Sequence, residues 1–291
     1  MSLLVGQQGI VCDFNTSGSW VVLSPIEQSI KQKIEALGTP LGEWKDIKIY
    51  RGVLTGCNEA FIIDTAKREE ILANCQSDEE RARTAQIIRP ILRGRDIGRY
   101  SCEWAGLYLI ATFPACHYDI EDYPAVRDYL LSFGKERLAQ SGETRIINGK
   151  TIKARKATHN QWFEMQDSIA YWEDFGKPKL IYSEITQEPQ FYFDERGEFY
   201  PEATTFIMVG ENLEYLYDVL HSKIATYLFK TFYAGGGLGN DGYRYKKAFL
   251  ELLPIPKPMR KYERSEIDYE LAKLYQFTDE EIKAISSSVK P

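Results

Sequence analysis

The chain has 291 residues, of which 44% are hydrophobic and 13% aromatic, so it is long enough to bury one large core or two modest ones. Its formal net charge is −6, which excludes a polycation that binds nucleic acid over its whole surface. Any contact with nucleic acid must therefore come from local basic patches on an acidic body.

The N-terminal half is predicted to alternate short strands with helices. A helix over residues 25–37 is indicated because isoleucine and leucine recur every three or four residues, Pro25 occupies the first turn, and Gly38 follows the last. Ile47, Ile49 and Val53 alternate as in a strand. The other elements predicted in this half are strands at 19–23, 60–64 and 107–112, and helices at 66–74 and 78–88.

The stretch NQWFEMQDSIAYWEDFGKPKLIYSEI, residues 160–185, is the most distinctive part of the C-terminal half. Trp162, Met165, Ile169, Trp172 and Phe175 lie three or four residues apart, which predicts an amphipathic helix whose aromatic stripe packs in the core. The Gly-Lys-Pro break then ends the helix, and LIYSEI is predicted as a strand. The remaining predicted elements are a helix at 123–140 broken by a glycine, strands at 190–194 and 204–210, an apolar helix at 212–232, a short helix at 248–253 and two helices within 264–286.

The order of these elements indicates the fold class. Strands and helices follow one another without a regular βαβ alternation, which predicts an α+β body with a helical C-terminal cap. Within that cap, Thr278 and Glu281 have the spacing of a capping box at a helix N-terminus.

Several motifs argue against other classes of protein. The five cysteines are scattered and form no CxxC, as expected of reduced thiols in a cytoplasmic protein and not of a disulfide framework or a zinc site. No signal peptide and no apolar run of about 20 residues is present, so no membrane contact is expected. His117, Asp119, Glu121 and Asp122 have metal-binding groups, but without a second His or Cys an ordinary polar loop is favoured. The glycine-rich loop at 235–239 lacks the GK[ST] of a phosphate-binding loop.

Three basic stretches are candidate DNA contacts. Residues 87–100 carry four arginines against the single acid Asp96, although a solvated basic face or structural ion pairs would explain this cluster equally well. The arm KTIKARK at 150–156 belongs to a run of five basic residues with no acid, beginning at Arg145. The glycine-rich loop ends in a third group at 244–247. Because cations of this kind hold a phosphate backbone, we expect the 150–156 arm to position DNA.

Polar residues beside these stretches are candidates for reading bases. Arginine can bridge guanine, and Asn or Gln can bridge adenine, each contributing ~1–3 kcal/mol of discrimination. On this basis the readers are expected among His159, Asn160, Gln161, Asn240 and Arg244. The full set of candidate DNA-binding residues is Arg93, Arg95, Arg99, Lys150, Lys153, Arg155, Lys156, His159, Asn160, Gln161, Asn240, Arg244, Lys246 and Lys247.

Five segments occur in an order typical of one protein family. They are IYRGVLTGCNEAFIID at 49–64, IIRPILRGRDIGRY at 87–100, the 160–185 stretch, YLYDVLHSKIATYLF at 215–229 and LLPIPKP at 252–258. Together they resemble the TaqI-like target-recognition (specificity) domain of adenine-specific DNA methyltransferases and fused type IIG restriction-modification enzymes. The resemblance implies a mixed, curved β-sheet recognition domain at 47–258, an N-terminal linking segment and helix at 1–46, and C-terminal helices at 259–291.

The resemblance also implies a function and partners. Such a domain reads double-stranded DNA for a methyltransferase, and in some enzymes a nuclease, domain of the same parent polypeptide. The chain contains neither a glycine-rich S-adenosylmethionine strand and loop nor an Asn/Asp-Pro-Pro-Tyr/Phe motif, so no catalytic residue and no cofactor are expected here. S-adenosylmethionine and Mg2+ are expected to bind the other domains of the parent. The family motifs are expected to be scaffold, with the base readers between them.

Two other interpretations follow from the same sequence. A type I restriction specificity subunit would resemble two recognition domains in tandem, whereas one set of motifs is present. A stand-alone metal-dependent hydrolase would have to use the acids between His117 and Asp122. Assays for duplex binding and for metal-dependent hydrolysis separate these classes.

Overall fold

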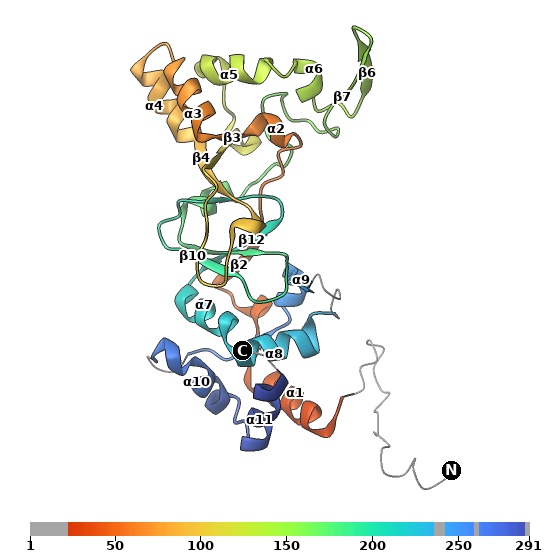
Figure 1. The fold of residues 1–291 in the computed structure, drawn as a ribbon, viewed down its shortest axis with the longest axis vertical. Coiled ribbons are helices and arrows are strands. Elements are labelled where there is room, and N and C mark those ends of the chain that lie inside the picture. The colour runs from red at the N-terminus through yellow and green to blue at the C-terminus, as the bar shows by residue number, and fades with distance from the viewer. Residues whose placement is uncertain (1–22, 236–241, 259–261, 289–291) are drawn as a thin grey trace, which may run out of the picture.

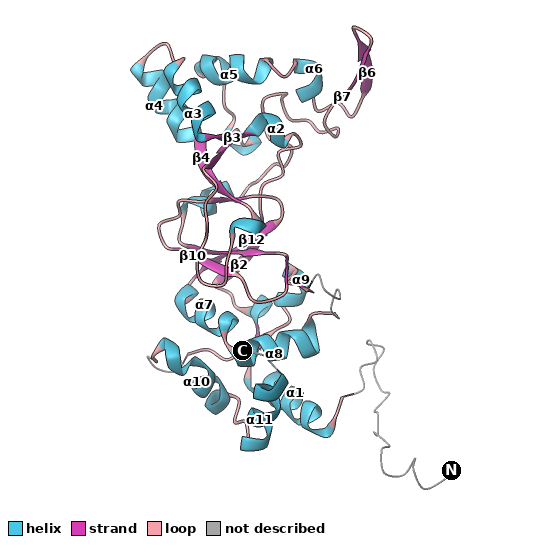
Figure 2. Ribbon diagram, viewed as in Figure 1, coloured by secondary structure: helices cyan, strands magenta, loops and turns pink. Residues whose placement is uncertain are grey.

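The structure is a computed structural model that describes residues 23–235, 242–258 and 262–288. The molecule is elongated, with helices at both ends and strands between them (Figures 1 and 2). Residues 19–22 of the strand predicted at 19–23 lie outside the described residues, as do Asn240 and most of the 235–239 loop.

A four-stranded antiparallel sheet crosses the middle of the molecule and contributes to two hydrophobic cores. Its strand order is β10-β8-β12-β2. The bounds are β2 Ile47–Arg51, β8 Lys179–Ser183, β10 Phe191–Asp194 and β12 Thr205–Gly210. Alternate residues of a strand point to opposite faces, so Ile49, Leu180 and Met208 enter one core while Ile181 and Ile207 enter the other.

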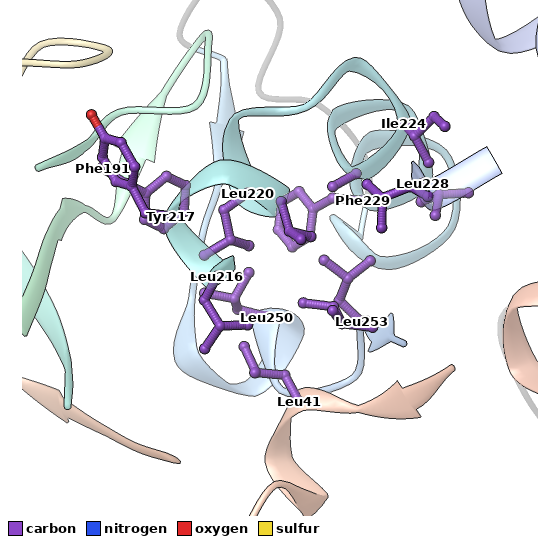
Figure 3. Packing of buried hydrophobic residues seen from close by; sticks show 14 of the residues in the cluster. Leu41, Phe191, Leu216, Tyr217, Leu220, Ile224, Leu228, Phe229, Leu250 and Leu253 are labelled. Carbon is purple, nitrogen blue, oxygen red and sulfur yellow. The ribbon is translucent and has the colours of Figure 1, made fainter. Parts of the chain in front are cut away.

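The first core joins the two ends of the chain. Its helices are α1 Pro25–Leu37, α7 Leu213–His221, α8 Lys223–Leu228, α9 Lys247–Leu250, α10 Ile267–Leu274 and α11 Asp279–Ser288. Figure 3 shows Leu216 and Leu220 of α7 facing Leu250 and Leu253, with Leu41 below them. Strand β1, Thr39–Pro40, pairs with β14, Pro254–Ile255. The described parts of the three predicted segments, 1–46, 47–258 and 259–291, therefore share this core.

Glu281 is the polar link between α1 and α11. Its carboxylate accepts hydrogen bonds from Ser29 Oγ at 2.7 Å and Lys33 Nζ at 2.6 Å, and from the main-chain N–H of Thr278 at 2.7 Å. Burial acts to raise the pKa of Glu281, but these bonds outweigh it and hold the pKa below its ordinary value of 4.5. The N–H of Glu281 donates to Thr278 Oγ1 in return, which confirms the predicted capping box.

The second core lies beneath a smaller mixed sheet at the other end of the molecule. The order is β11-β4-β5-β3, with β11 parallel to β4 and the other pairs antiparallel. The strands are β3 Ile62–Asp64, β4 Ile88–Leu92, β5 Leu107–Ile110 and β11 Tyr200–Pro201. The helices are α2 Asn58–Phe61, α3 Thr65–Ala73, α4 Asp78–Ile87, α5 Pro124–Leu131 and α6 Lys135–Leu138. The α+β prediction is confirmed.

Two further strand pairs extend from this body. They are the hairpin of β6 Thr144–Ile147 with β7 Lys150–Lys153, and the pair of β9 Ile185–Thr186 with β13 Tyr243–Arg244. The sequence analysis described the first as a basic arm and did not predict a hairpin.

The predicted amphipathic helix over 162–175 is wrong. Only a short 3-10 turn forms there, at Trp172–Gly176. Partners outside the stretch take the backbone groups that a helix would pair. The Met165 N–H donates to the carbonyl of Thr112 at 2.9 Å, and the Arg155 side chain donates to the carbonyls of Trp162 and Glu164 at 2.8 Å. The spacing of the apolar residues indicated that the stretch is buried but not that it is helical: Phe163, Met165 and Ile169 are buried although the backbone that carries them is irregular.

Other predicted helices form with breaks. The apolar helix at 212–232 divides at Ser222, whose extended backbone ends α7 and whose hydroxyl accepts from the Ala225 N–H at 3.0 Å to cap α8. The helix at 123–140 divides at Gly134, which has a φ of 87° that an L residue rarely adopts. The strand predicted at 60–64 is shorter than expected, because helix α2 includes residues 60 and 61 and β3 begins at Ile62. Within the described residues, no helix is long and apolar enough to cross a membrane.

Candidate nucleic-acid interface

Two hollows in the surface lie on either side of the short helix α2. The first, called the waist hollow, has a volume of about 700 Å³ and is lined by Arg51, Asn58, Ile62, Arg93, Gly94, Arg95, Leu107, Ser183, Glu184, Ile185, Glu202, Ala203 and Thr204. The second, called the hairpin hollow, has a volume of about 630 Å³ and is lined by Gly56, Cys57, Glu59, Arg137, Gly142, Lys153, Ala154, Arg155, Lys156 and Ala157. The two hollows are neighbours, because Gly56, Cys57 and Glu59 line the hairpin hollow while Asn58, within the same segment, lines the waist hollow.

The waist hollow contains one fixed arginine and two exposed ones. Arg93 donates two hydrogen bonds to Asp96, from Nε at 2.8 Å and Nη2 at 2.7 Å, and these raise the pKa of Arg93. Burial would raise the pKa of Asp96, but Arg93 outweighs burial and lowers it. Arg93 is therefore held by a structural ion pair, as one interpretation of the cluster expected. Arg51 and Arg95 are exposed on the same hollow.

The wall of the waist hollow is polar and ordered. Glu202 Oε2 accepts from the Thr204 N–H at 3.0 Å and from its hydroxyl at 2.6 Å. Asn58 Oδ1 accepts from the Thr55 hydroxyl at 2.6 Å, on the exposed side of α2. Guanidinium, amide, hydroxyl and carboxylate groups thus converge here. These are the groups that form hydrogen bonds with the edges of bases.

The third basic stretch borders the waist hollow through a strand pair. Arg244 of β13 pairs with Ile185 of β9, and the Tyr245 N–H donates to the carbonyl of Glu184 at 2.7 Å. Ile185 and Glu184 themselves line the hollow. Further along, the ammonium of Lys246 lies 6.0 Å from the Phe249 ring centre, and Lys247 is exposed and pairs with Glu251 at 3.6 Å.

The hairpin hollow collects most of the 150–156 arm. Lys153 and Lys156 are exposed on it, and Arg137 also lines it and forms an ion pair with Glu59. Lys150 lies further out, at the start of β7, where it is also exposed. The three lysines are therefore placed for contact with a polyanion.

Arg155 has a different role from the lysines around it. Only 4% of its surface is exposed, and its guanidinium donates to four main-chain carbonyls at 2.8–2.9 Å, those of Thr55, Leu138, Trp162 and Glu164. Burial lowers the pKa of Arg155 to about 10, so the group is still charged at neutral pH. With its donors committed inside the fold, Arg155 holds the arm in place, in contrast to the phosphate contact expected from the sequence.

The predicted reading loop at 159–161 is partly structural. The side-chain amide of Asn160 donates to the carbonyls of Met165 and Gln166, both at 3.0 Å, so this amide stabilises the loop. The Gln161 N–H donates to Glu164 Oε2 at 2.6 Å, and the side chains of Gln161 and His159 are exposed.

Arg99, the remaining predicted residue of the 87–100 stretch, lines neither hollow. Arg99 donates to the carbonyl of His221 at 3.4 Å and lies over the Tyr100 ring, on the side of α7. In the same stretch, the Gly94 N–H donates to Thr204 Oγ1 at 3.4 Å and the Gly98 N–H donates to the carbonyl of Ser101 at 2.8 Å, so both groups have partners within the fold. The described residues contain no group of three His, Cys, Asp or Glu side chains placed to hold a metal ion.

The sequence analysis missed several residues of the hollows. Arg51 and Asn58 belong to the first family motif, which was expected to be scaffold. Arg51 ends β2 and Asn58 begins α2, and polar residues at such positions could have been predicted as members of a binding surface. Ser183, Thr204 and Arg137 come from separate segments, and only the packing of the two sheets brings them to the same surface.

Comparison with known proteins identifies the family. The model of the TaqI-like C-terminal specificity domain matches residues 89–255, more than half of the chain, and the chain belongs to this family. The resemblance stated from the motifs is therefore confirmed, and with it a role in recognising DNA targets.

Two solved structures are similar to the chain at low identity. The type IIG restriction endonuclease BpuSI has a TM-score of 0.48 and 12% identity, over 85% of this chain and 28% of that one. The type IIL restriction-modification enzyme MmeI, in complex with DNA, has a TM-score of 0.42 and 11% identity, over 84% and 33%. The chain thus spans a third or less of each of these enzymes.

Proposed function

We propose that this chain reads the DNA target site for a type IIG-like restriction-modification adenine methyltransferase. The observation that carries the proposal is that two basic stretches, far apart in sequence, supply lining residues to adjoining hollows, while the third stretch borders the waist hollow through the β9–β13 pair. Figure 1 shows the hairpin, α2 and the central strands following one another along the molecule. A surface of this kind offers a duplex several phosphate contacts although the net charge of the chain is −6.

The proposal divides positioning from reading. Lys150, Lys153 and Lys156 are exposed point charges and contact phosphates, which fixes the register of the duplex. Arg51 and Arg95 in the waist hollow are the candidates for bridging guanine, because their guanidinium groups are exposed beside the ordered polar wall.

The catalytic partner is proposed to be a methyltransferase domain of the same parent polypeptide, with or without a nuclease domain. That domain, and not this chain, would bind S-adenosylmethionine, and any nuclease would use Mg2+. Calorimetric titration of S-adenosylmethionine into the chain is expected to give no binding heat. Micromolar binding would contradict this division of labour.

Selection from a randomised duplex pool tests the reading function directly. The chain is expected to enrich one sequence, with an affinity that falls steeply between about 50 and 200 mM salt because counterions are released from the phosphates. Arg95→Ala is expected to relax the preference at one base pair. Arg196→Ala is the matched control, since that side chain is 83% exposed and lies outside both hollows. The proposal would be overturned if no sequence were enriched from the pool, or if the affinity did not change with salt concentration.

A further inference from the structure

The β6–β7 hairpin is a two-stranded ribbon that projects from the α6 end of the molecule (Figure 1). Its turn consists of Asn148 and Gly149, with φ values of 52° and 75°. Positive φ at both central residues is the mark of a type I′ turn, whose twist matches that of the strands it joins. The ribbon therefore has a well-defined end and a fixed register.

The register assigns the side chains of the ribbon to two faces. Thr144 lies opposite Lys153, and Ile146 lies opposite Thr151, so these four share one face. The other face consists of Arg145, Ile147, Lys150 and Ile152. We call the first the outer face and the second the inner face.

The two faces have different surroundings. On the inner face, Ile147 and Ile152 are half-buried, and Ile152 and Arg145 line a small hollow of about 80 Å³ together with Glu136 and Ala139 of the α6 region. On the outer face, Ile146 is 77% exposed, and Lys153 lines the hairpin hollow. The outer face thus continues the surface that carries the exposed lysines.

The base of the ribbon is fixed to the fold. The Arg155 N–H donates to the carbonyl of Ala139 at 2.9 Å, and the Gly142 N–H donates to the carbonyl of Arg155 at 2.8 Å. The buried guanidinium of Arg155 holds the same point from inside. A ribbon anchored in this way loses little conformational entropy when it binds a partner.

We propose that this ribbon enters the major groove of the duplex with its outer face toward the base edges, and that Ile146 contacts the 5-methyl group of a thymine. The inference rests on the proposed function and names how part of the target is read. The major groove is wide enough for a two-stranded ribbon, and the thymine methyl is the apolar group that it displays. Charge agrees, since Lys153 shares the outer face with Ile146, and the acid next to β6, Glu143, is paired with Arg145 of the inner face.

The test compares thymine with deoxyuridine, which differs only by the methyl group. The full chain first selects a duplex from a randomised pool, and each thymine of that duplex is then replaced in turn. For the unchanged chain, one replacement is expected to weaken binding about fourfold, the effect of one buried methyl group. Ile146→Ala is expected to weaken binding of the thymine duplex about tenfold and to be insensitive to that same replacement.

Ile26→Ala is the matched control, because it makes the same truncation on α1, where Ile26 is 40% exposed. It is expected to bind both duplexes as the unchanged chain does, and both variants are expected to keep the same unfolding midpoint. If Ile146→Ala binds like the control, or keeps the penalty for deoxyuridine, the ribbon does not read thymine. That result leaves the salt-dependent selection intact, whereas failure of the unchanged chain to select any duplex overturns the proposed function itself.

Discussion

The strongest stability prediction concerns Arg155. Its guanidinium bonds to four main-chain carbonyls that come from three separate segments: residue 55 before α2, residue 138 at the end of α6, and residues 162 and 164 of the irregular stretch. Arg155→Ala removes all four donors at once. The Glu164 carbonyl keeps a bond from Gln140 Nε2 at 3.0 Å, whereas the carbonyls of Thr55, Leu138 and Trp162 lose the side chain that bonds to them.

The size of the loss follows from the number of bonds and from burial. A hydrogen bond to a charged group contributes about 1.5–3 kcal/mol net, and four such bonds to one group are not additive. We expect the free energy of unfolding to fall by about 3–5 kcal/mol, as when one partner of a buried charged network is removed. Arg155→Lys should recover only part of this, because an ammonium cannot reproduce the planar fork of donors. Lys153 is exposed at the end of β7, two residues before Arg155, and Lys153→Ala should change stability by less than about 0.5 kcal/mol.

Urea unfolding followed by tryptophan fluorescence at pH 7 measures these differences. The pH is suitable because the pKa of Arg155, about 10, leaves the guanidinium protonated in the folded state. A loss of less than about 1 kcal/mol for Arg155→Ala would refute the structural role. So would a variant of unchanged stability that binds DNA with a reduced salt slope, since that is the behaviour of a phosphate contact.

Three further predictions concern charge. Lys153→Ala combined with Lys156→Ala should weaken binding to all duplex sequences alike and lower the salt slope by about two, as measured by titration at several salt concentrations. Lys179→Met should destabilise the fold by about 3–5 kcal/mol in urea unfolding, because it leaves Asp194 buried without the ammonium now 2.6 Å away. The stability contributed by Glu281 is complete above pH 4.5 and is lost as the pH falls through its lowered pKa in the folded state, so Glu281→Gln should flatten the decline of unfolding free energy below pH 4.5, and an unchanged decline would contradict this.

Local patterns in the sequence were sufficient for most helix and strand positions. The helix at Pro25–Leu37 and the capping box before α11 agree with their predictions, because a cap, a first-turn proline and an apolar face act within a few residues of one another. The Asn148-Gly149 turn had an equally local signal, Asn-Gly between two short β-prone runs, and the hairpin was predictable although it was not predicted.

The failure over 162–175 has a different cause. Spacing of three or four residues shows which side chains are buried, but it does not show whether their backbone pairs with itself or with other segments. Here Thr112 and Gln140, both distant in sequence, and Arg155, which precedes the stretch, take its main-chain groups. A window of the sequence contains no information on such partners.

The same distinction applies to the candidate interface. By itself, the sequence determined the family, the α+β class and the presence of three cationic stretches on an acidic chain, because motif order, periodicity and charge are properties of the chain alone. Only the tertiary structure decided that Arg155 turns inward to four carbonyls while Lys153 and Lys156 on either side of it face a hollow. Neighbours of like charge diverge in this way because strand β7 ends at Lys153, so the direction of the Arg155 side chain is not set by strand register. It is set by the carbonyls that accept from it, and those of Thr55 and Leu138 belong to other segments of the chain.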